Sequence, residues 1–129
     1  MNRSHNSEWG LPLFFALIGF IFWANVPGLH AGLFARTGLP DAVIPLHMIA
    51  NGAQGTGWFL VAWLSWTCRW RMAAWLAYFL AGMWCWDMMT TAYLPHMPVP
   101  PLQWCWGPAS VVLMVAAANR LWRRPSIAF

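Results

Sequence analysis

A single carboxylate, Asp87, lies within the apolar run from Ala73 to Leu94, which is long enough to cross a lipid bilayer. A charged side chain is costly in hydrocarbon, so an acidic residue in such a run normally faces the interior of a helix bundle and has a polar partner there. We therefore expect the chain to form a bundle of membrane helices that encloses Asp87.

The composition excludes a water-soluble domain. Hydrophobic residues make up 60% of the 129 residues and charged residues only 8%, against roughly 25% in an ordinary soluble protein. The net charge is +4, and the seven basic residues are all arginines, too few and too dispersed for a nucleic-acid-binding face. We expect no nucleic-acid partner, and we interpret the arginines as topology determinants that contact anionic lipids.

The sequence contains four apolar runs, each close to the roughly 20 residues that cross a bilayer. They cover residues 9–27, 43–66, 73–94 and 103–122. A basic segment separates the second run from the third, and four prolines between residues 95 and 101 interrupt the chain before the fourth. These features predict an all-α membrane protein. Residues 1–129 would form a single transmembrane domain of four transmembrane helices in a compact up-down bundle.

The arginines also predict the orientation. With four spans, both termini lie on one side of the membrane; six of the seven arginines fall on that side and only Arg36 on the other. The positive-inside rule then predicts cytoplasmic N- and C-termini in a multi-pass protein of a bacterial inner membrane. Tryptophans favour the membrane–water interfaces, and those expected at the cytoplasmic interface are Trp9, Trp66, Trp70, Trp75 and Trp122.

Polar residues recur at helical spacing in the second run. His47, Asn51, Gln54 and Trp58 fall on one stripe of a helix. The residues expected to share the face of Asp87 on the third run are Met83, Trp84, Thr90 and Thr91. Unpaired polar groups are costly in hydrocarbon, so we expect the two stripes to face each other and to form a polar pocket with aromatic walls.

Such a polar network has two interpretations. In the first, it joins helices and fixes their register without any chemistry. In the second, it is a binding site in which Asp87 and His47, the two candidate catalytic residues, exchange protons with a hydrophobic ligand such as a quinone, sterol, terpenoid or carotenoid. The expected ligand-binding residues are then Asn51, Gln54, Trp58, Met83, Trp84 and Thr91.

A metal or pigment site is a further alternative. Imidazole and soft sulfur ligands of the kind that copper(I) favours are present at His47, Met48, His96, Met97, Cys85 and Cys105. Their spacing matches no established metal motif, and Met and Cys are also ordinary fillers of apolar helices. His47 would be the axial ligand if the chain held a haem or a chlorin.

The second run also contains three closely spaced glycines, Gly52, Gly55 and Gly57. Small residues at this density let two helices approach closely in lipid, either within the bundle or between copies in a homo-oligomer. Because the chain leaves no room for a domain outside the membrane, we expect a non-catalytic subunit, or a ligand- or cofactor-binding component, of a larger membrane assembly. The alternatives are a compact membrane enzyme or carrier that uses Asp87 and His47, and a protein that handles copper or another metal on the outer side.

Overall fold

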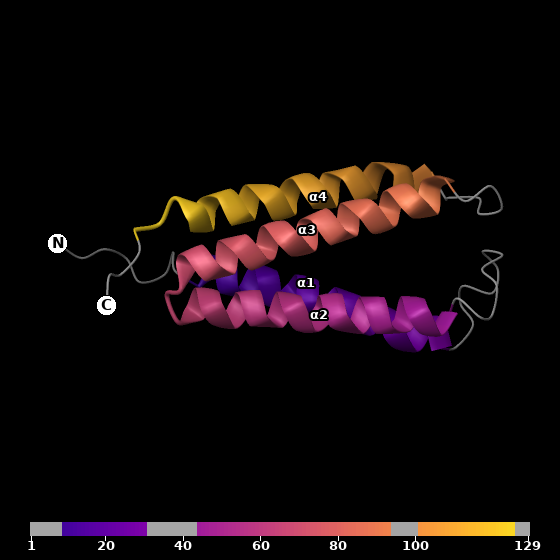
Figure 1. The fold of residues 1–129 in the computed structure, drawn as a ribbon, viewed down its shortest axis with the longest axis horizontal. Helices are drawn as coiled ribbons and strands as arrows, with labels where there is room; N and C mark the ends of the chain where they lie inside the picture. Colours follow the sequence, from indigo (N-terminus) through magenta and orange to yellow (C-terminus); the bar gives the residue numbers. More distant parts are fainter. Residues whose placement is uncertain (1–8, 31–43, 94–100, 126–129) are drawn as a thin grey trace.

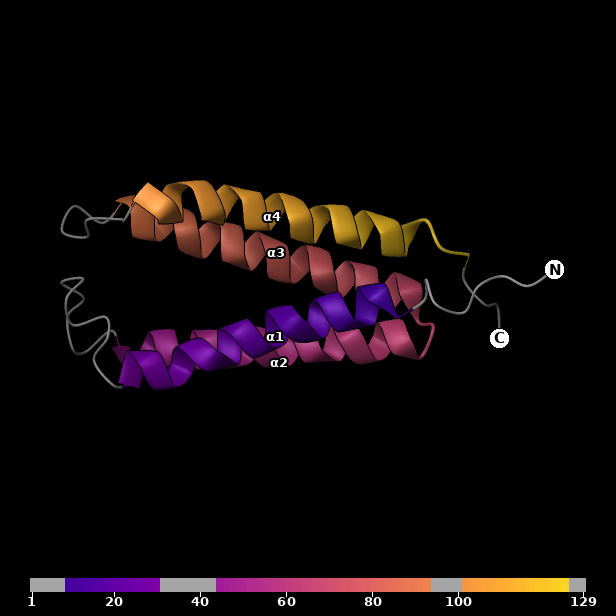
Figure 2. The same ribbon diagram turned by 180° about the vertical axis from the view of Figure 1, so that it is seen from behind.

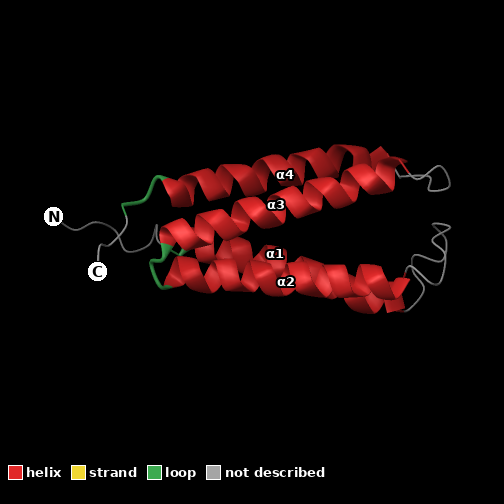
Figure 3. Cartoon of the chain, in the orientation of Figure 1, coloured by secondary structure: helices red, strands yellow, loops and turns green. Residues whose placement is uncertain are grey.

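A computed structural model describes residues 9–30, 44–93 and 101–125, with the backbone alone at 28–30, 44, 90–93 and 101–104. This part of the chain is helical and contains no strand (Figures 1 and 3). The four helices are α1 (Gly10–His30), α2 (Ile44–Trp66), α3 (Trp70–Tyr93) and α4 (Pro101–Trp122). The predicted all-helical architecture with four helices is therefore confirmed.

The helices extend beyond the predicted runs at several ends. α1 continues through Pro27 to His30, three residues past the expected end. A proline removes one backbone hydrogen bond, but the next turn can still form its own. α3 begins at Trp70 rather than Ala73, because the Arg69 carbonyl already accepts a hydrogen bond from the Ala73 N–H at 3.0 Å. The basic connection between α2 and α3 is therefore only three residues long.

The helices form two antiparallel pairs. α1 packs along α2, α3 packs along α4, and α2 contacts α3. The two pairs lie close together at the end where α2 joins α3, and they diverge toward the opposite end in both views (Figures 1 and 2). We call these the closed end and the wide end.

Side-chain burial follows this divergence. Phe15, Trp58, Ala77 and Leu121, one from each helix, are fully buried near the closed end and in the middle of the bundle. In contrast, no side chain is buried over residues 45–53 of α2 or over residues 82–89 of α3. The core therefore fills the closed half of the bundle, whereas the inward faces of α2 and α3 stay partly open in the wide half.

Glycines allow the tight pairing of α1 with α2. A Cβ atom on Gly19 of α1 would lie 2.9 Å from the carbonyl oxygen of Gly55 on α2. A Cβ atom on Gly55 would lie 2.5 Å from the Trp23 ring and 3.0 Å from the Gly19 carbonyl oxygen. The close approach predicted from the glycine-rich stretch is thus made within the chain, between backbones that no larger residue would allow to meet.

The turn between α2 and α3 is a Schellman motif. The N–H of Arg69 bonds to the Leu64 carbonyl at 2.9 Å, and the N–H of Cys68 bonds to the Ser65 carbonyl at 3.3 Å. Cys68 has the left-handed conformation that this motif requires, with φ of 59°. Glycine normally occupies this position, so the Cβ atom of Cys68 is accommodated at a cost in energy.

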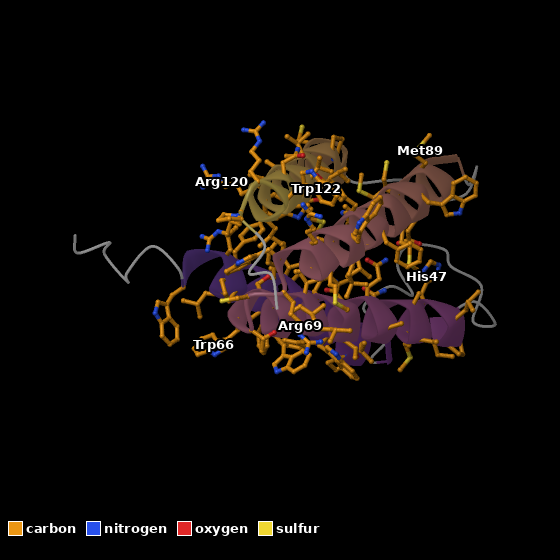
Figure 4. All side chains as sticks on the ribbon, turned by 60° about the vertical axis from the view of Figure 1, so that its left-hand side comes forward. His47, Trp66, Arg69, Met89, Arg120 and Trp122 are labelled. Atoms are coloured by element: carbon orange, nitrogen blue, oxygen red, sulfur yellow. The ribbon has the colours of Figure 1, made fainter. Side chains whose placement is uncertain are left out.

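The outer surface of the bundle is apolar along most of its length. Every exposed residue of α3 from Met72 to Met89, and of α4 from Cys105 to Ala116, is apolar or a cysteine. The exposed arginines of the described ranges lie at the closed end, and Figure 4 places Arg69 and Arg120 at the opposite end from His47. Within the described ranges, one segment, Gly10–Pro27 near the N-terminus, is long and apolar enough to span a membrane.

Candidate functional site

The structure brings His47 of α2 and Asp87 of α3 together in the wide half of the bundle. Both side chains are half-buried, and the imidazole lies near enough to influence the carboxyl group electrostatically. His47 and Met89 lie toward the wide end, while Trp66 and Trp122 lie toward the closed end (Figure 4). These are the two residues that the sequence analysis named as candidate catalytic residues.

The polar stripe of α2 faces the interior of the bundle, as two flanking glycines demonstrate. On one side of the stripe, Gly55 packs against α1; on the other, a Cβ atom on Gly57 would lie 2.8 Å from Leu80 of α3. Gln54 and Trp58, which lie between these contacts on the helix, are 3% and 0% exposed. Both belong to the predicted ligand-binding set, and they form its deepest part.

Asn51 satisfies its amide on its own helix. Its Nδ2 atom donates a hydrogen bond of 2.9 Å to the carbonyl of His47, one turn earlier. The side chain remains half-buried beside the stripe. Asn51 therefore holds the backbone next to His47 and does not cross to α3 in this structure.

Gln54 and Trp58 retain unused hydrogen-bonding groups. The Gln54 Oε1 atom and the Trp58 Nε1 atom are both buried and have no hydrogen-bond partner among the described residues. The Trp58 ring stacks on Phe15 of α1, with centroids 5.7 Å apart and the planes only 6° from parallel. This stacking fixes the plane of the indole and so the direction of its N–H bond.

Trp84 connects three helices. Its Nε1–H donates a hydrogen bond of 2.9 Å to the Ser110 hydroxyl on α4, and its ring meets the edge of Phe22 on α1 at 5.1 Å between centroids. Ser110 in turn donates a bond of 2.7 Å to the Gly107 carbonyl. Ser110, Phe15 and Phe22 are parts of the site that the sequence analysis did not identify. The one available signal was Ser110 itself, the single hydroxyl residue in the fourth apolar run.

Other residues predicted at the site are Met83, Thr90 and Thr91. Met83 is 38% exposed, whereas its neighbour Trp84 is half-buried. Adjacent helical residues point about 100° apart, so the two side chains have different directions. Of Thr90 and Thr91, the structure describes only the backbone.

The candidate metal ligands do not form a cluster in the described chain. Cys85 is half-buried, Cys105 is exposed, and both are free thiols. No group of three or more His, Cys, Asp or Glu side chains is placed to hold a metal ion within the described ranges. Met48 is half-buried on α2 beside His47, while His96 and Met97 lie outside the described residues.

Tryptophans and arginines from different helices meet at the closed end. The guanidinium of Arg124 lies 4.5 Å from the Trp70 ring centroid, and that of Arg71 lies 5.9 Å from the Trp122 ring. The Trp75 ring packs edge-on against Trp122 at 5.7 Å. Trp9 and Trp66 form a similar pair at 4.1 Å. All five tryptophans expected at one interface therefore gather at one end of the molecule.

The chain matches no protein-family model, no curated protein and no solved structure. The described site offers an acidic and a basic side chain at the wide end, and an amide oxygen with an indole N–H further in. Two aromatic pairs join the helices, Phe15 of α1 with Trp58 of α2 and Phe22 of α1 with Trp84 of α3. Such a lining suits an apolar molecule that carries a small number of polar atoms.

Proposed function

We propose that the chain is a multi-pass protein of a bacterial inner membrane that binds a hydrophobic small molecule between its two helix pairs. In this role it is a non-catalytic component of a larger membrane assembly. The observation that carries the proposal is an inversion of polarity. The outer faces of the helices are apolar along most of their length, while His47, Gln54 and Asp87 are at least partly buried.

The one exposed polar side chain of α2 supports a lipid environment. The Thr56 hydroxyl donates a hydrogen bond of 2.8 Å to the Gly52 carbonyl of its own helix. Its neighbours on that face, such as Phe59 and Leu60, are exposed apolar residues. A threonine that bonds back to its helix places no unpaired polar hydrogen in hydrocarbon, which is how such residues are tolerated in membrane helices.

Charge does not explain why α2 is less hydrophobic than α1. α2 contains no Asp, Glu, Lys or Arg. Its lower hydropathy comes from inward-facing residues such as Asn51 and Gln54 and from the glycines at the helix contacts. In a bundle that shields these residues from lipid, the outer face of the helix is the part that must be apolar.

The proposed orientation places the closed end in the cytoplasm. Arg69, Arg71, Arg120, Arg123 and Arg124 all lie at the turn or the helix ends found there. Lys and Arg favour the cytoplasmic side, and tryptophans favour the interface. The wide end, with His47 and Asp87, then opens toward the outer side.

A membrane enzyme or carrier is the second candidate, because His47 and Asp87 are near enough to influence each other electrostatically. An imidazole and a carboxylate that both reach a bound molecule are able to exchange protons with it.

We also propose that the chain associates with other subunits, because its exposed outer side chains are largely apolar. The glycines that we expected to mediate contacts between copies are used inside the chain, Gly55 against α1 and Gly57 against α3. A homo-oligomer or a partner subunit would therefore use exposed side chains such as Trp75, Phe79 and Leu113.

The test is to purify the protein in a mild detergent, record its absorption spectrum and identify extracted small molecules by mass spectrometry. We expect a hydrophobic molecule at a fixed ratio to protein, and a large loss of it in a Trp84→Ala variant. Trp106→Ala is the matched control, because Trp106 is 59% exposed on the outer face of α4. Extraction of bulk phospholipids alone, equal in all three proteins, would contradict the proposal.

A further inference from the structure

We propose that Gln54 and Trp58 form a subsite for a hydroxyl group, and that the hydrophobic ligand is therefore an apolar alcohol or phenol. This inference rests on the ligand-binding function proposed above and deepens it. Its basis is the pair of buried, unpartnered atoms on one face of α2, the Gln54 Oε1 acceptor and the Trp58 Nε1–H donor. Unpaired polar atoms this deep are uncommon in folded proteins and call for an explanation.

The spacing of the two residues suits one bridging atom. Helical residues four positions apart have Cβ atoms about 5–6 Å apart on the same face. Both side chains extend from the same face of α2, so their terminal polar atoms are able to converge on one ligand oxygen about 2.7–3.0 Å from each. A single oxygen atom of a ligand is therefore able to contact both Gln54 and Trp58.

The chemistry of the two atoms selects a hydroxyl group. Gln54 Oε1 needs a donor, and Trp58 Nε1–H needs an acceptor; a hydroxyl group supplies both at one atom. A carbonyl or an ether oxygen accepts from Trp58 but has no hydrogen to give to Gln54. An ammonium group has no lone pair for Trp58, and burying an unpaired charge in this interior is costly.

The surroundings favour an apolar body on that hydroxyl group. The Trp58 ring is held against Phe15, and Trp84 with Phe22 covers the next layer toward the wide end. Gln54 lies seven residues from His47, which is about 10 Å along the helix axis. Both atoms are sealed by protein in this state, so the ligand enters as the helix pairs move apart at the wide end, where residues are not closely packed.

The test is a binding assay on the full-length protein in detergent with three matched probes: the isoprenoid alcohol farnesol, its methyl ether, and its aldehyde farnesal. For the wild type we expect farnesol to bind about tenfold more tightly than the other two, because only the alcohol makes both hydrogen bonds. Gln54→Leu should remove this preference. Thr56→Val, on the exposed face of the same helix, should preserve it.

A second measurement separates the proposal from a structural role for the pair. If Gln54 is unpaired without ligand, Gln54→Leu, which replaces the buried amide with an apolar group of similar size, will not lower the Tm of the ligand-free protein. A clear fall in Tm would mean that the two side chains bond to each other or to a buried water, and would overturn the inference.

The outcomes also separate the subsite from the function on which it rests. Saturable binding of all three probes with equal affinity would overturn the hydroxyl subsite and leave the ligand-binding function standing. Persistence of the preference in Gln54→Leu would also overturn the subsite. Saturable binding of none of the probes would overturn the subsite and count against the proposed function as well.

Discussion

The carboxyl group of Asp87 on α3 interacts electrostatically with the imidazole of His47 on α2, from opposite helix pairs. The interaction lies in the half of the bundle where the inward faces of these two helices are not fully buried. It is therefore a polar link across the part of the molecule that is least held together by apolar packing.

Removing this link should weaken the contact between the helix pairs. We expect Asp87→Asn to fold and to lower stability modestly, and a double-mutant cycle with His47→Gln to give a coupling of about 1 kcal/mol. Thermal unfolding of the four proteins in one detergent measures it. Strict additivity of the two substitutions would show that the residues do not interact in the folded protein.

The crossing of α1 and α2 should be intolerant of any side chain at Gly55. Gly55→Ala is expected to cost about 1–3 kcal/mol, because the new methyl group would overlap the Trp23 ring and press on the Gly19 backbone. Gly82→Ala is the matched control, since a Cβ atom there meets nothing within 4 Å and alanine favours a helix. Equal unfolding temperatures for the two variants would contradict the close crossing.

A glycine at position 68 should stabilise the turn between α2 and α3, because the backbone conformation there favours glycine. Cys68 has a φ of 59°, so Cys68→Gly is expected to raise stability by about 1 kcal/mol. Cys68→Ala keeps the Cβ atom and should bring no such gain. A loss of stability in the glycine variant, measured by thermal unfolding, would mean that the turn does not have this conformation.

The hydrogen bond from Trp84 to Ser110 should hold α3 against α4. Ser110→Ala leaves the partly buried indole N–H without its acceptor, so we expect a loss of about 1–2 kcal/mol. In a Trp84→Phe background the same substitution should cost much less, because no donor remains. Identical costs of Ser110→Ala in the two backgrounds would contradict this pairing.

The proposed topology predicts which thiols an impermeant reagent reaches. In a variant whose one cysteine is Cys68, at the arginine-rich end, we expect labelling only after the cytoplasmic side is opened. A single cysteine at Pro45→Cys, at the wide end of α2, should react in intact cells. The reverse pattern would invert the orientation, and reaction of both in intact cells would argue against membrane spans.

Much of the architecture was predictable from the sequence, because it depends on the hydrophobicity of each segment and on residue spacing along it. The length of the apolar runs and the prolines between them predicted four helices and their order. Helical spacing predicted that His47, Gln54 and Trp58 share a face, and the cost of a buried charge predicted that Asp87 turns toward it. Gly55 predicted a close helix contact, although not its partner.

The partners themselves depended on the tertiary structure. Spacing along one helix does not specify which neighbouring helix each face meets, so the contact of Gly55 with Gly19 and the bond from Trp84 to Ser110 required the packed bundle. The same holds for the difference in exposure between Met83 and its neighbour Trp84. It holds also for the unpaired atoms of Gln54 and Trp58, because hydrogen-bond satisfaction is a property of the whole set of neighbours.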